Sequence, residues 1–297
     1  MAINASGSIE RKFEIRVKYG FLREARLSNE ILFNALPREE DLVMLFRHGV
    51  DVYSFPVRTF LGESMRSLNF KEEAVMWLDN VALLRLESYE DWWKKIGKKT
   101  RNMVRKSERQ GVSVRVIDRS TNEIVEGLWR IYNETPIRQD RWFKGYGKPK
   151  EHFKQWRPPD PNVAEVLGAF WRERLIGFLT LVYGDGVAMI SQMLSMIKHF
   201  DKAPNNALIA AAVKRCCERR VKFLVYARMG NHLSLDRFKE SNGFVKYYLP
   251  RYYVPLTRRG VISLRLKLYG YPQDRVPESL KKLMIPIYNA LSRKLRL

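Results

Sequence analysis

The alternation of apolar and polar residues divides the first half of the chain into strands and helices. Apolar runs predict strands at residues 13–19, 50–60 and 74–86, with short helical or irregular segments between them. Residues 112–117 alternate again and predict a further strand, and the apolar positions that follow Asn122 recur at helical spacing. The pattern therefore predicts a mixed α/β protein.

The second half of the chain predicts antiparallel strands followed by alternating helices and strands. A second helix is expected before residue 157, and three apolar strands then follow between residues 163 and 197, separated by turn signals around residues 173 and 185. The remaining predicted elements are a helix that opens at Pro204 and Asn205, a strand at 221–230, a short helix at 233–240, and a pair of strands at 244–249 and 251–256.

Residues 97–114, GKKTRNMVRKSERQGVSV, belong to a predicted helix with one basic side. This helix spans about residues 90–110, because acidic residues precede it, basic residues continue along it and Gly111 ends it. One stripe of it carries Lys98, Arg101, Arg105 and Arg109. The opposite side carries Trp93, Ile96, Thr100 and Met103. Two interpretations stand at this point: the stripe is a solvated face, or it binds an anion.

Composition and charge extend this question to the whole chain. The 297 residues include 54 Lys and Arg against 32 Asp and Glu, which gives a formal net charge of +22. A field of that sign favours nucleic acid, an anionic membrane surface or phosphorylated substrates. The alternative is a generally basic surface whose charges form ion-pair networks. The hydrophobic fraction of 45% is enough for one large domain or two of ordinary size.

The cysteines and histidines indicate whether the chain has a disulfide, a metal site or a catalytic triad. Cys216 and Cys217 are neighbours, so a disulfide between them would be strained, and this usage fits a reducing cytoplasm. The N-terminal residues lack the apolar core of a signal peptide, and no run approaches the roughly 18 apolar residues of a membrane-spanning helix. We therefore expect a soluble, cytoplasmic protein. The four histidines lack metal-ligand spacing and no Ser-His-Asp signature is present, so we expect neither a metal nor a covalent nucleophile.

Four stretches resemble the GNAT fold of N-acyltransferases. They are KKTRNMVRKSERQGVSV, RLIGFLTLVYGDGVAMI, PNNALIAAAVKRCCERRVKFLVYARMG and SLDRFKESNGFVKYYLPRYYVPL. Within that superfamily the chain looks most like the FemAB/FemX branch of peptidyltransferase-like aminoacyltransferases and their acetyltransferase-like relatives. The resemblance implies an α/β (α+β) fold in which helices flank a mixed, mostly antiparallel sheet, together with a smaller, degenerate GNAT-like N-terminal half.

The same resemblance implies a division of the chain into four segments. These are an N-terminal α/β half at 1–90, a basic connecting helix at 91–111, a GNAT-like acyltransferase domain at 112–260, and a C-terminal strand and helical extension at 261–297.

The resemblance also implies how such a protein acts. The strands near 187–197 and 222–230 would part and offer backbone N–H groups to an acyl donor and its oxyanion. An amine would attack the donor carbonyl directly, with acyl-CoA or aminoacyl-tRNA as the donor. Acyl-CoA users place a Gly-rich loop before the next helix, where backbone amides approach the pyrophosphate. Residues 198–208, KHFDKAPNNAL, contain no glycine, and FemX-like enzymes, which take aminoacyl-tRNA, depart in the same way.

Candidate phosphate ligands follow from this comparison. The predicted ligands are Lys198, Asn205 and Asn206 around the helix start, Arg228 at the end of the central strand, and Arg101 and Arg105 of the basic stripe. They would contact tRNA or another phosphorylated ligand. The alternative at the helix start is an ordinary capped helix after a lysine-rich turn.

Two residues are candidates for catalysis. By resemblance, Lys239 occupies the family position whose ammonium lies near the reacting carbonyl or the phosphates of the acceptor. Tyr248 is chosen among four tyrosines at the place where GNAT enzymes often keep a tyrosine that returns a proton to the leaving group. The others are Tyr247, Tyr252 and Tyr253. The alternatives are a solvated lysine and aromatic residues that only pack.

The sequence thus predicts a transferase that moves an acyl or aminoacyl group onto an amine. One rival is a catalytically inactive GNAT-fold protein that binds nucleic acid, which the charge and the missing glycine loop favour. Another is a CoA-dependent acetyltransferase for a small amine or a protein N-terminus. The acceptor, the role of residues 1–90 and the oligomeric state stay open.

Overall fold

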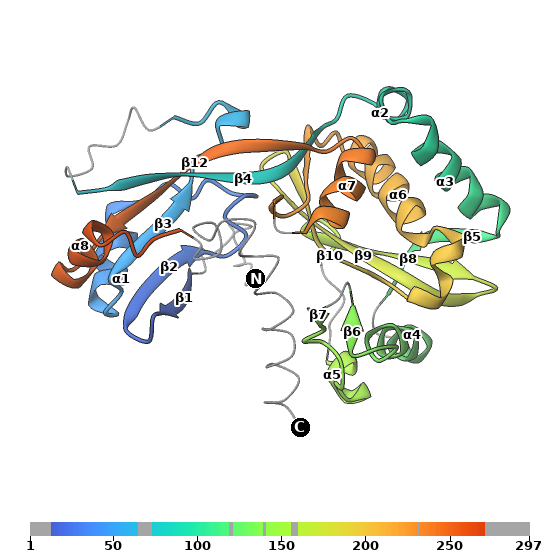
Figure 1. Ribbon diagram of the computed structural model, residues 1–297, viewed down its shortest axis with the longest axis horizontal. Coiled ribbons are helices and arrows are strands. Elements are labelled where there is room, and N and C mark those ends of the chain that lie inside the picture. Colours follow the sequence, from blue (N-terminus) through green and yellow to red (C-terminus); the bar gives the residue numbers. More distant parts are fainter. Residues whose placement is uncertain are drawn as a thin grey trace. The chain divides into compact units, whose positions relative to one another are not determined.

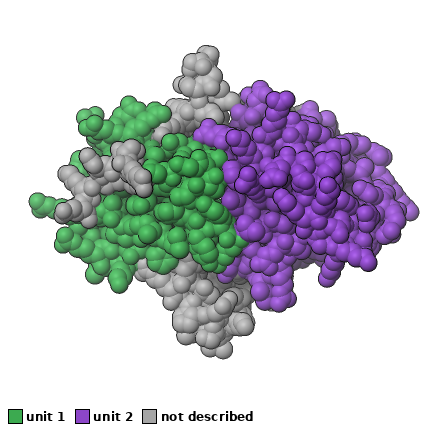
Figure 2. Space-filling model, turned by 90° about the horizontal axis from the view of Figure 1, so that it is seen from above, with its two compact units in different colours: residues 1–81, 246–272 green, residues 82–245, 273–297 purple. Residues whose placement is uncertain are grey.

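The computed structural model describes residues 13–64, 73–118, 121–138, 141–155, 160–230 and 232–270. The chain forms two compact units (Figure 2): unit 1 contains residues 1–81 and 246–272, and unit 2 contains residues 82–245 and 273–297. Two long strands, β4 (Val75–Arg85) and β12 (Val245–Pro255), begin in one unit and end in the other. The units therefore divide the chain differently from the predicted segments, because β12 completes the sheet of unit 1.

Unit 1 is a small sheet with a helix on each face. Its strands β1 (Phe13–Lys18) and β2 (Leu22–Leu27) are antiparallel, β3 (Val52–Pro56) runs parallel to β2, and β12 pairs antiparallel with β3. Alternate residues of β3 point to opposite faces. Tyr53 and Phe55 pack with Leu45 of α1 (Glu39–Arg47), whereas Val52 packs with Leu264 of α8 (Arg258–Arg265). A short 3₁₀ helix, η1 (Thr59–Leu61), follows β3.

Unit 2 contains a larger sheet whose strands follow the order β4, β11, β10, β9, β8, β5. The bounds are β5 (Val112–Val116), β8 (Ala164–Trp171), β9 (Arg174–Gly184), β10 (Val187–Ser195) and β11 (Phe223–Val225). All neighbours are antiparallel except β10 and β11, which are parallel. This is the predicted mixed, mostly antiparallel sheet, and the expected fold class is confirmed.

Helices cover both faces of the sheet in unit 2 (Figure 1). One face is covered by α2 (Tyr89–Lys95), α3 (Lys98–Arg109) and α6 (Pro204–Glu218), whose apolar residues share a core with β9 and β10. On the other face α4 (Asn122–Tyr132) and α5 (Lys150–Lys154) share a second core with β8 and β9. The remaining elements are the short strands β6 (Ile137–Arg138) and β7 (Arg141–Trp142), the 3₁₀ helix η2 (Ile197–Lys202) and α7 (Leu233–Ser241).

The basic helix predicted over about 90–110 is two helices, so that prediction is wrong in one respect. Ile96 leaves the helical conformation with ψ of 148°, and Gly97 then caps α3. Thr100, Val104 and Ser107 form the buried side of α3. Met103, which the continuous helix placed on the apolar side, is only half-buried.

The strand pair predicted at 244–249 and 251–256 is also wrong, because β12 runs through Pro250 without a turn. Proline has no N–H to donate, but its carbonyl still accepts a hydrogen bond, here from the N–H of Val57 at 2.8 Å. Residues Arg251–Pro255 then pair with β3 in regular register. No helix within the described part of the chain is long and apolar enough to cross a membrane.

Candidate active site

The two central strands of unit 2 part after three paired residues. Val187, Ala188 and Met189 of β10 pair with Phe223, Leu224 and Val225 of β11. Strand β10 then continues to Ser195 alongside β9, whereas β11 ends at Val225. The next residue, Tyr226, donates its N–H to the carbonyl of Ala82 in β4 at 2.8 Å, so the chain stays paired with β4 where its pairing with β10 has ended. The predicted parting of these strands is confirmed.

Strand β10 carries a β-bulge where the strands separate. Ile190 pairs with Leu181 and Gln192 with Thr180, which leaves Ser191 as the extra, exposed residue. A bulge bends the strand and redirects its groups, and bulges are frequent beside active sites. The amide of Gln192 donates to the hydroxyl of Tyr132, which fixes β10 to α4 on the far side of the bulge. Nothing in the apolar pattern of residues 187–195 marks this bulge.

Lys239 lies buried at the end of β11. Its side chain is 1% exposed, its Nζ donates to the carbonyl of Arg228 at 2.8 Å, and the same Nζ lies 4.8 Å from the centre of the Tyr226 ring. Burial lowers the pKa of Lys239 to about 8, and the nearby Asp236 carboxylate opposes this shift. The ammonium is therefore still largely present at neutral pH, in surroundings where a charge acts strongly.

Tyr226 is a candidate site residue, in contact with Lys239, that the sequence analysis did not single out. It directly follows β11 and is half-buried, with its ring edge against Phe244 at 6.0 Å and the ammonium of Lys239 over its face. Burial raises the pKa of Tyr226 to about 12, so its hydroxyl keeps its proton at neutral pH and is able to donate it. The available signal was its position as the last aromatic residue of the predicted central strand.

The four tyrosines proposed from the sequence belong to unit 1. Tyr248 is 52% exposed, with the Nζ of Lys246 at 5.2 Å from its ring. Tyr247 hydrogen-bonds Thr59 at 3.1 Å. Tyr252 stacks on Phe55, and Tyr253 is fully buried. Within unit 2, Tyr226 is the tyrosine that contacts Lys239 among the described residues.

A carboxylate of the chain occupies the backbone amides that follow β10. Glu134 accepts hydrogen bonds from the N–H groups of Ile197 at 2.7 Å and Lys198 at 3.0 Å. Arg138 holds this carboxylate at 3.3 Å and also donates to the carbonyl of Ser195 at 2.8 Å. A phosphate could bind these two N–H groups only by displacing the Glu134 carboxylate. The Lys198 side chain is exposed.

The start of α6 is closed by its own contacts. Ala203 is the N-cap residue, in a left-handed conformation with φ of 53°, and Pro204 follows at the first helical position. Asn205 accepts a hydrogen bond from the hydroxyl of Ser195 at 2.7 Å, and the N–H of Asn206 donates to the carbonyl of Ala203 at 3.1 Å. The side chain of Asn205 therefore has a structural contact, whereas Asn206 contributes its main-chain N–H, and phosphate binding by either asparagine stays a prediction.

The two arginines of the basic stripe differ in their surroundings. Arg101 donates through Nη1 to the carbonyls of Trp93, Lys94 and Ile96, and it thereby caps the end of α2. Arg105 is exposed and lies 5.5 Å from the centre of the Trp93 ring. Arg228 is half-buried directly after the parted strand β11. Binding of phosphate by these residues stays a prediction.

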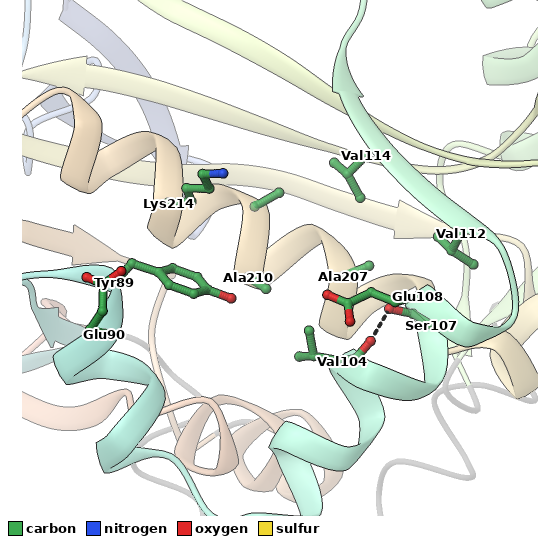
Figure 3. A pocket seen from close by; sticks show the side chains of 11 residues that line it. Tyr89, Glu90, Val104, Ser107, Glu108, Val112, Val114, Ala207, Ala210 and Lys214 are labelled. Carbon is green, nitrogen blue, oxygen red and sulfur yellow. Dashed lines mark hydrogen bonds between the residues drawn. The ribbon is translucent and has the colours of Figure 1, made fainter.

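A cavity of about 450 Å³ lies between α2, α3, α6 and β5 (Figure 3). Alanine and valine side chains line its floor, and Tyr89, Glu90, Glu108 and Lys214 stand around it. Burial raises the pKa of the Tyr89 hydroxyl, and the Glu108 and Glu90 carboxylates add to the shift. Two carboxylates beside one lysine do not favour an anionic ligand, so this cavity does not suit a phosphate.

Comparisons with solved structures support the fold. FemX has a TM-score of 0.57 with this chain at 10% sequence identity, over 89% of each chain. The structure of L-PGS from Bacillus licheniformis has a TM-score of 0.51 at 15% identity, over 77% of this chain and 76% of that one. A search of family models found no match. A search of curated proteins also found none. At this level of identity the comparisons establish a GNAT-like fold of the FemAB/FemX type.

Proposed function

We propose that unit 2 transfers an aminoacyl group from an aminoacyl-tRNA to an amine, in the gap between β10 and β11. The observation that carries the proposal is the conjunction of two features of this gap. The strands separate after Met189 and Val225, and a buried ammonium, that of Lys239, lies at the end of the shorter strand. Such a gap leaves main-chain groups of a central strand available to a substrate carbonyl, and a fixed cation stabilises the charge that develops on it.

The chemistry requires little beyond these groups. The acceptor nitrogen attacks the ester carbonyl of the donor, the carbon–nitrogen bond forms, and the carbon–oxygen bond to the ribose of the tRNA breaks. Lys239 stabilises the negative charge on the carbonyl oxygen; an ammonium has three N–H donors, and the carbonyl of Arg228 accepts from one of them. Tyr226, which keeps its proton, supplies it to the leaving ribose oxygen. The neutral amine is the attacking group; once it has added, its nitrogen releases the excess proton to water, and Tyr226 takes a proton back from water.

The contacts of Glu134 favour aminoacyl-tRNA over acyl-CoA as the donor. In a CoA user the pyrophosphate needs the backbone amides between the central strand and the next helix. Here Glu134 takes the amides of Ile197 and Lys198, and residues 198–208 contain no glycine that would let a phosphate approach. A carboxylate at this position also repels a pyrophosphate. A tRNA makes its main contacts through its backbone elsewhere on the surface, and the net charge of +22 suits it.

The proposal is tested with both classes of donor. Total tRNA charged with radiolabelled amino acids, and separately a set of radiolabelled acyl-CoAs, are incubated with the protein and with the small amines, proteins or lipids of a cell extract. Label is expected to leave the tRNA faster than in spontaneous hydrolysis and to appear in one acceptor fraction. The matched control is Lys239→Met, which preserves volume and removes the charge. Transfer from acyl-CoA alone would overturn the assignment of aminoacyl-tRNA as the donor. Salt-sensitive binding of tRNA without any transfer would overturn the proposal that the protein is a transferase.

A further inference from the structure

One end of unit 1 exposes three aromatic side chains that do not stabilise its fold by burial. Tyr19 and Phe21 are each 46% exposed in the turn between β1 and β2, and Phe46 is 56% exposed at the end of α1. Single exposed apolar residues are ordinary, but a group of large ones gathered at one place marks an interaction site. Beside Phe46, Val43 and Met44 are also exposed, at 44% and 36%.

Buried Asp51 brings these elements to the same end of the sheet. Its carboxylate accepts from the N–H of Arg23 at 3.0 Å and from the hydroxyl of Thr257 at 2.7 Å, and its own N–H donates to the carbonyl of Arg23 at 2.8 Å. Arg23 lies two residues after Phe21, Thr257 is the N-cap of α8, and Asp51 itself lies five residues after Phe46. Figure 1 shows the β1–β2 turn, α1 and α8 at this end of unit 1.

The same end of unit 1 is positively charged. Its exposed basic residues are Arg23, Arg47, Arg258 and Arg259. The acidic residues of α1 are in its first turn, at the opposite end of the helix, and Asp51 is only 3% exposed. An approaching surface therefore meets both aromatic rings and guanidinium groups at this end, although the guanidinium of Arg259 also lies 3.9 Å from the Asp51 carboxylate. We name Tyr19, Phe21, Phe46 and these four arginines the arginine-aromatic end.

The turn that carries Tyr19 places a bulky residue in the left-handed conformation. Tyr19 and Gly20 have φ of 54° and 78°, both in the left-handed region, and with Phe21 they form the turn between the paired residues Lys18 and Leu22. Asparagine, aspartate or glycine is the usual residue at the first of these positions, and a bulky residue there costs on the order of 1 kcal/mol. The chain instead places an exposed tyrosine ring at the tip, next to Phe21.

We propose that the arginine-aromatic end binds the surface of an anionic lipid bilayer. The rings of Tyr19, Phe21 and Phe46 enter the interfacial region, where aromatic side chains are favoured, and the arginines pair with lipid phosphates. Exposed Val43 and Met44 favour a bilayer over RNA, because aliphatic groups gain free energy from burial among acyl chains and nothing from stacking on bases. The inference concerns unit 1 and does not depend on the transferase proposed for unit 2.

The test measures binding of the full chain to vesicles of phosphatidylcholine with and without 30% phosphatidylglycerol, as an order-of-magnitude physiological anionic content. The double variant Phe21→Ser/Phe46→Ser leaves the charge unchanged and is expected to bind the anionic vesicles about tenfold more weakly. The matched control, Val116→Ser/Val245→Ser, removes two other exposed apolar side chains and should bind like the parent. If the Phe21→Ser/Phe46→Ser variant binds anionic vesicles as tightly as the Val116→Ser/Val245→Ser control, the proposal is overturned, because adsorption then follows from net charge alone.

Two further measurements distinguish lipid binding from a loss of stability and from binding to RNA. Tyr19→Asn suits the left-handed conformation, so it should melt at the same or a higher temperature and yet bind anionic vesicles more weakly. An environment-sensitive fluorophore on Phe46→Cys, in a Cys217→Ser background, should brighten and shift to the blue with anionic vesicles and not with tRNA. A shift with tRNA and none with vesicles would assign the arginine-aromatic end to nucleic acid and overturn the lipid proposal.

Discussion

The Nζ atom of Lys239 donates a hydrogen bond to the carbonyl oxygen of Arg228 at 2.8 Å. This contact joins α7 to the segment that follows β11, at the place where β11 stops pairing with β10. A lysine that only solubilises a helix extends into water, whereas this side chain is 1% exposed. Burying an ammonium is unfavourable unless partners compensate it, and the lowered pKa of Lys239 indicates that its carbonyl acceptor, the Tyr226 ring and the nearby Asp236 carboxylate compensate it only in part.

Substitution of Lys239 is expected to affect transfer more than folding. Lys239→Met should lower kcat by about 100-fold to 1,000-fold, the range found when one stabilising donor is removed from an oxyanion site. The melting temperature should stay within a few degrees of the parent, since a buried charge is replaced by an apolar side chain of similar volume. Single-turnover kinetics and thermal melts measure the two effects. A large loss of stability with unchanged kcat would assign Lys239 a structural role instead.

The pH dependence should reveal the charge state of Lys239. Because burial lowers its pKa to about 8, transfer should fall as the pH rises through 8, when the ammonium loses its proton. Lys239→Arg should extend the activity to higher pH, as a guanidinium stays charged. Stability should change with pH in the opposite direction to activity. Between pH 8 and the unfolded pKa of Lys239 near 10.5, the unfolded chain binds more protons than the folded chain, so the free energy of unfolding rises with pH. Comparing denaturant melts with those of Lys239→Met isolates this contribution.

Glu134 should control which donor the protein accepts. Glu134→Gln removes the charge and retains the shape, and it should weaken the hold on the amides of Ile197 and Lys198. We expect this variant to gain a measurable rise of melting temperature with coenzyme A, which the parent should lack. Differential scanning fluorimetry with coenzyme A and with pyrophosphate measures the effect. A parent that coenzyme A already stabilises would show that Glu134 does not block the phosphates.

Alanine substitutions of Arg101 and Arg105 should distinguish a role in capping α2 from a role in binding phosphate. Arg101→Ala removes the cap of α2 and should lower the free energy of unfolding by about 1 kcal/mol. Arg105→Ala should leave stability within about 0.5 kcal/mol. If Arg105 contacts a phosphate, its loss should reduce the salt slope of tRNA binding by about one. Filter binding across a salt series decides this, and an unchanged slope would mean that the basic stripe is a solvated face.

The sequence predicted the elements that depend on local pattern. Three antiparallel strands, the helix opened by Pro204 and the short helix carrying Lys239 all have strong local signals, namely alternation, a proline at the first helical position and a hydrophobic period. The break at Gly97 was missed because the apolar period continues almost in phase across it. The continuous strand through Pro250 was missed because a proline normally interrupts a central strand.

The candidate site was harder to predict because its parts meet through long-range packing. Lys239 came from resemblance, and its burial beneath Arg228 depends on contacts that no local pattern specifies. Tyr226 was read as an ordinary strand residue, and the four tyrosines chosen instead lie in unit 1, since β12 leaves unit 2 immediately after Val245. Glu134 was missed because it approaches Ile197 and Lys198 from more than 60 residues earlier in the chain.

The most direct measurement is a crystal structure of the protein with a short RNA ending in CCA that carries an aminoacyl group through a stable amide in place of the ester. Our account predicts that the amide carbonyl lies in the gap between β10 and the end of β11, within about 3 Å of the Nζ of Lys239. It would be contradicted by an analogue bound elsewhere on unit 2, with β10 and β11 paired beyond Met189 and Val225 and Lys239 still enclosed.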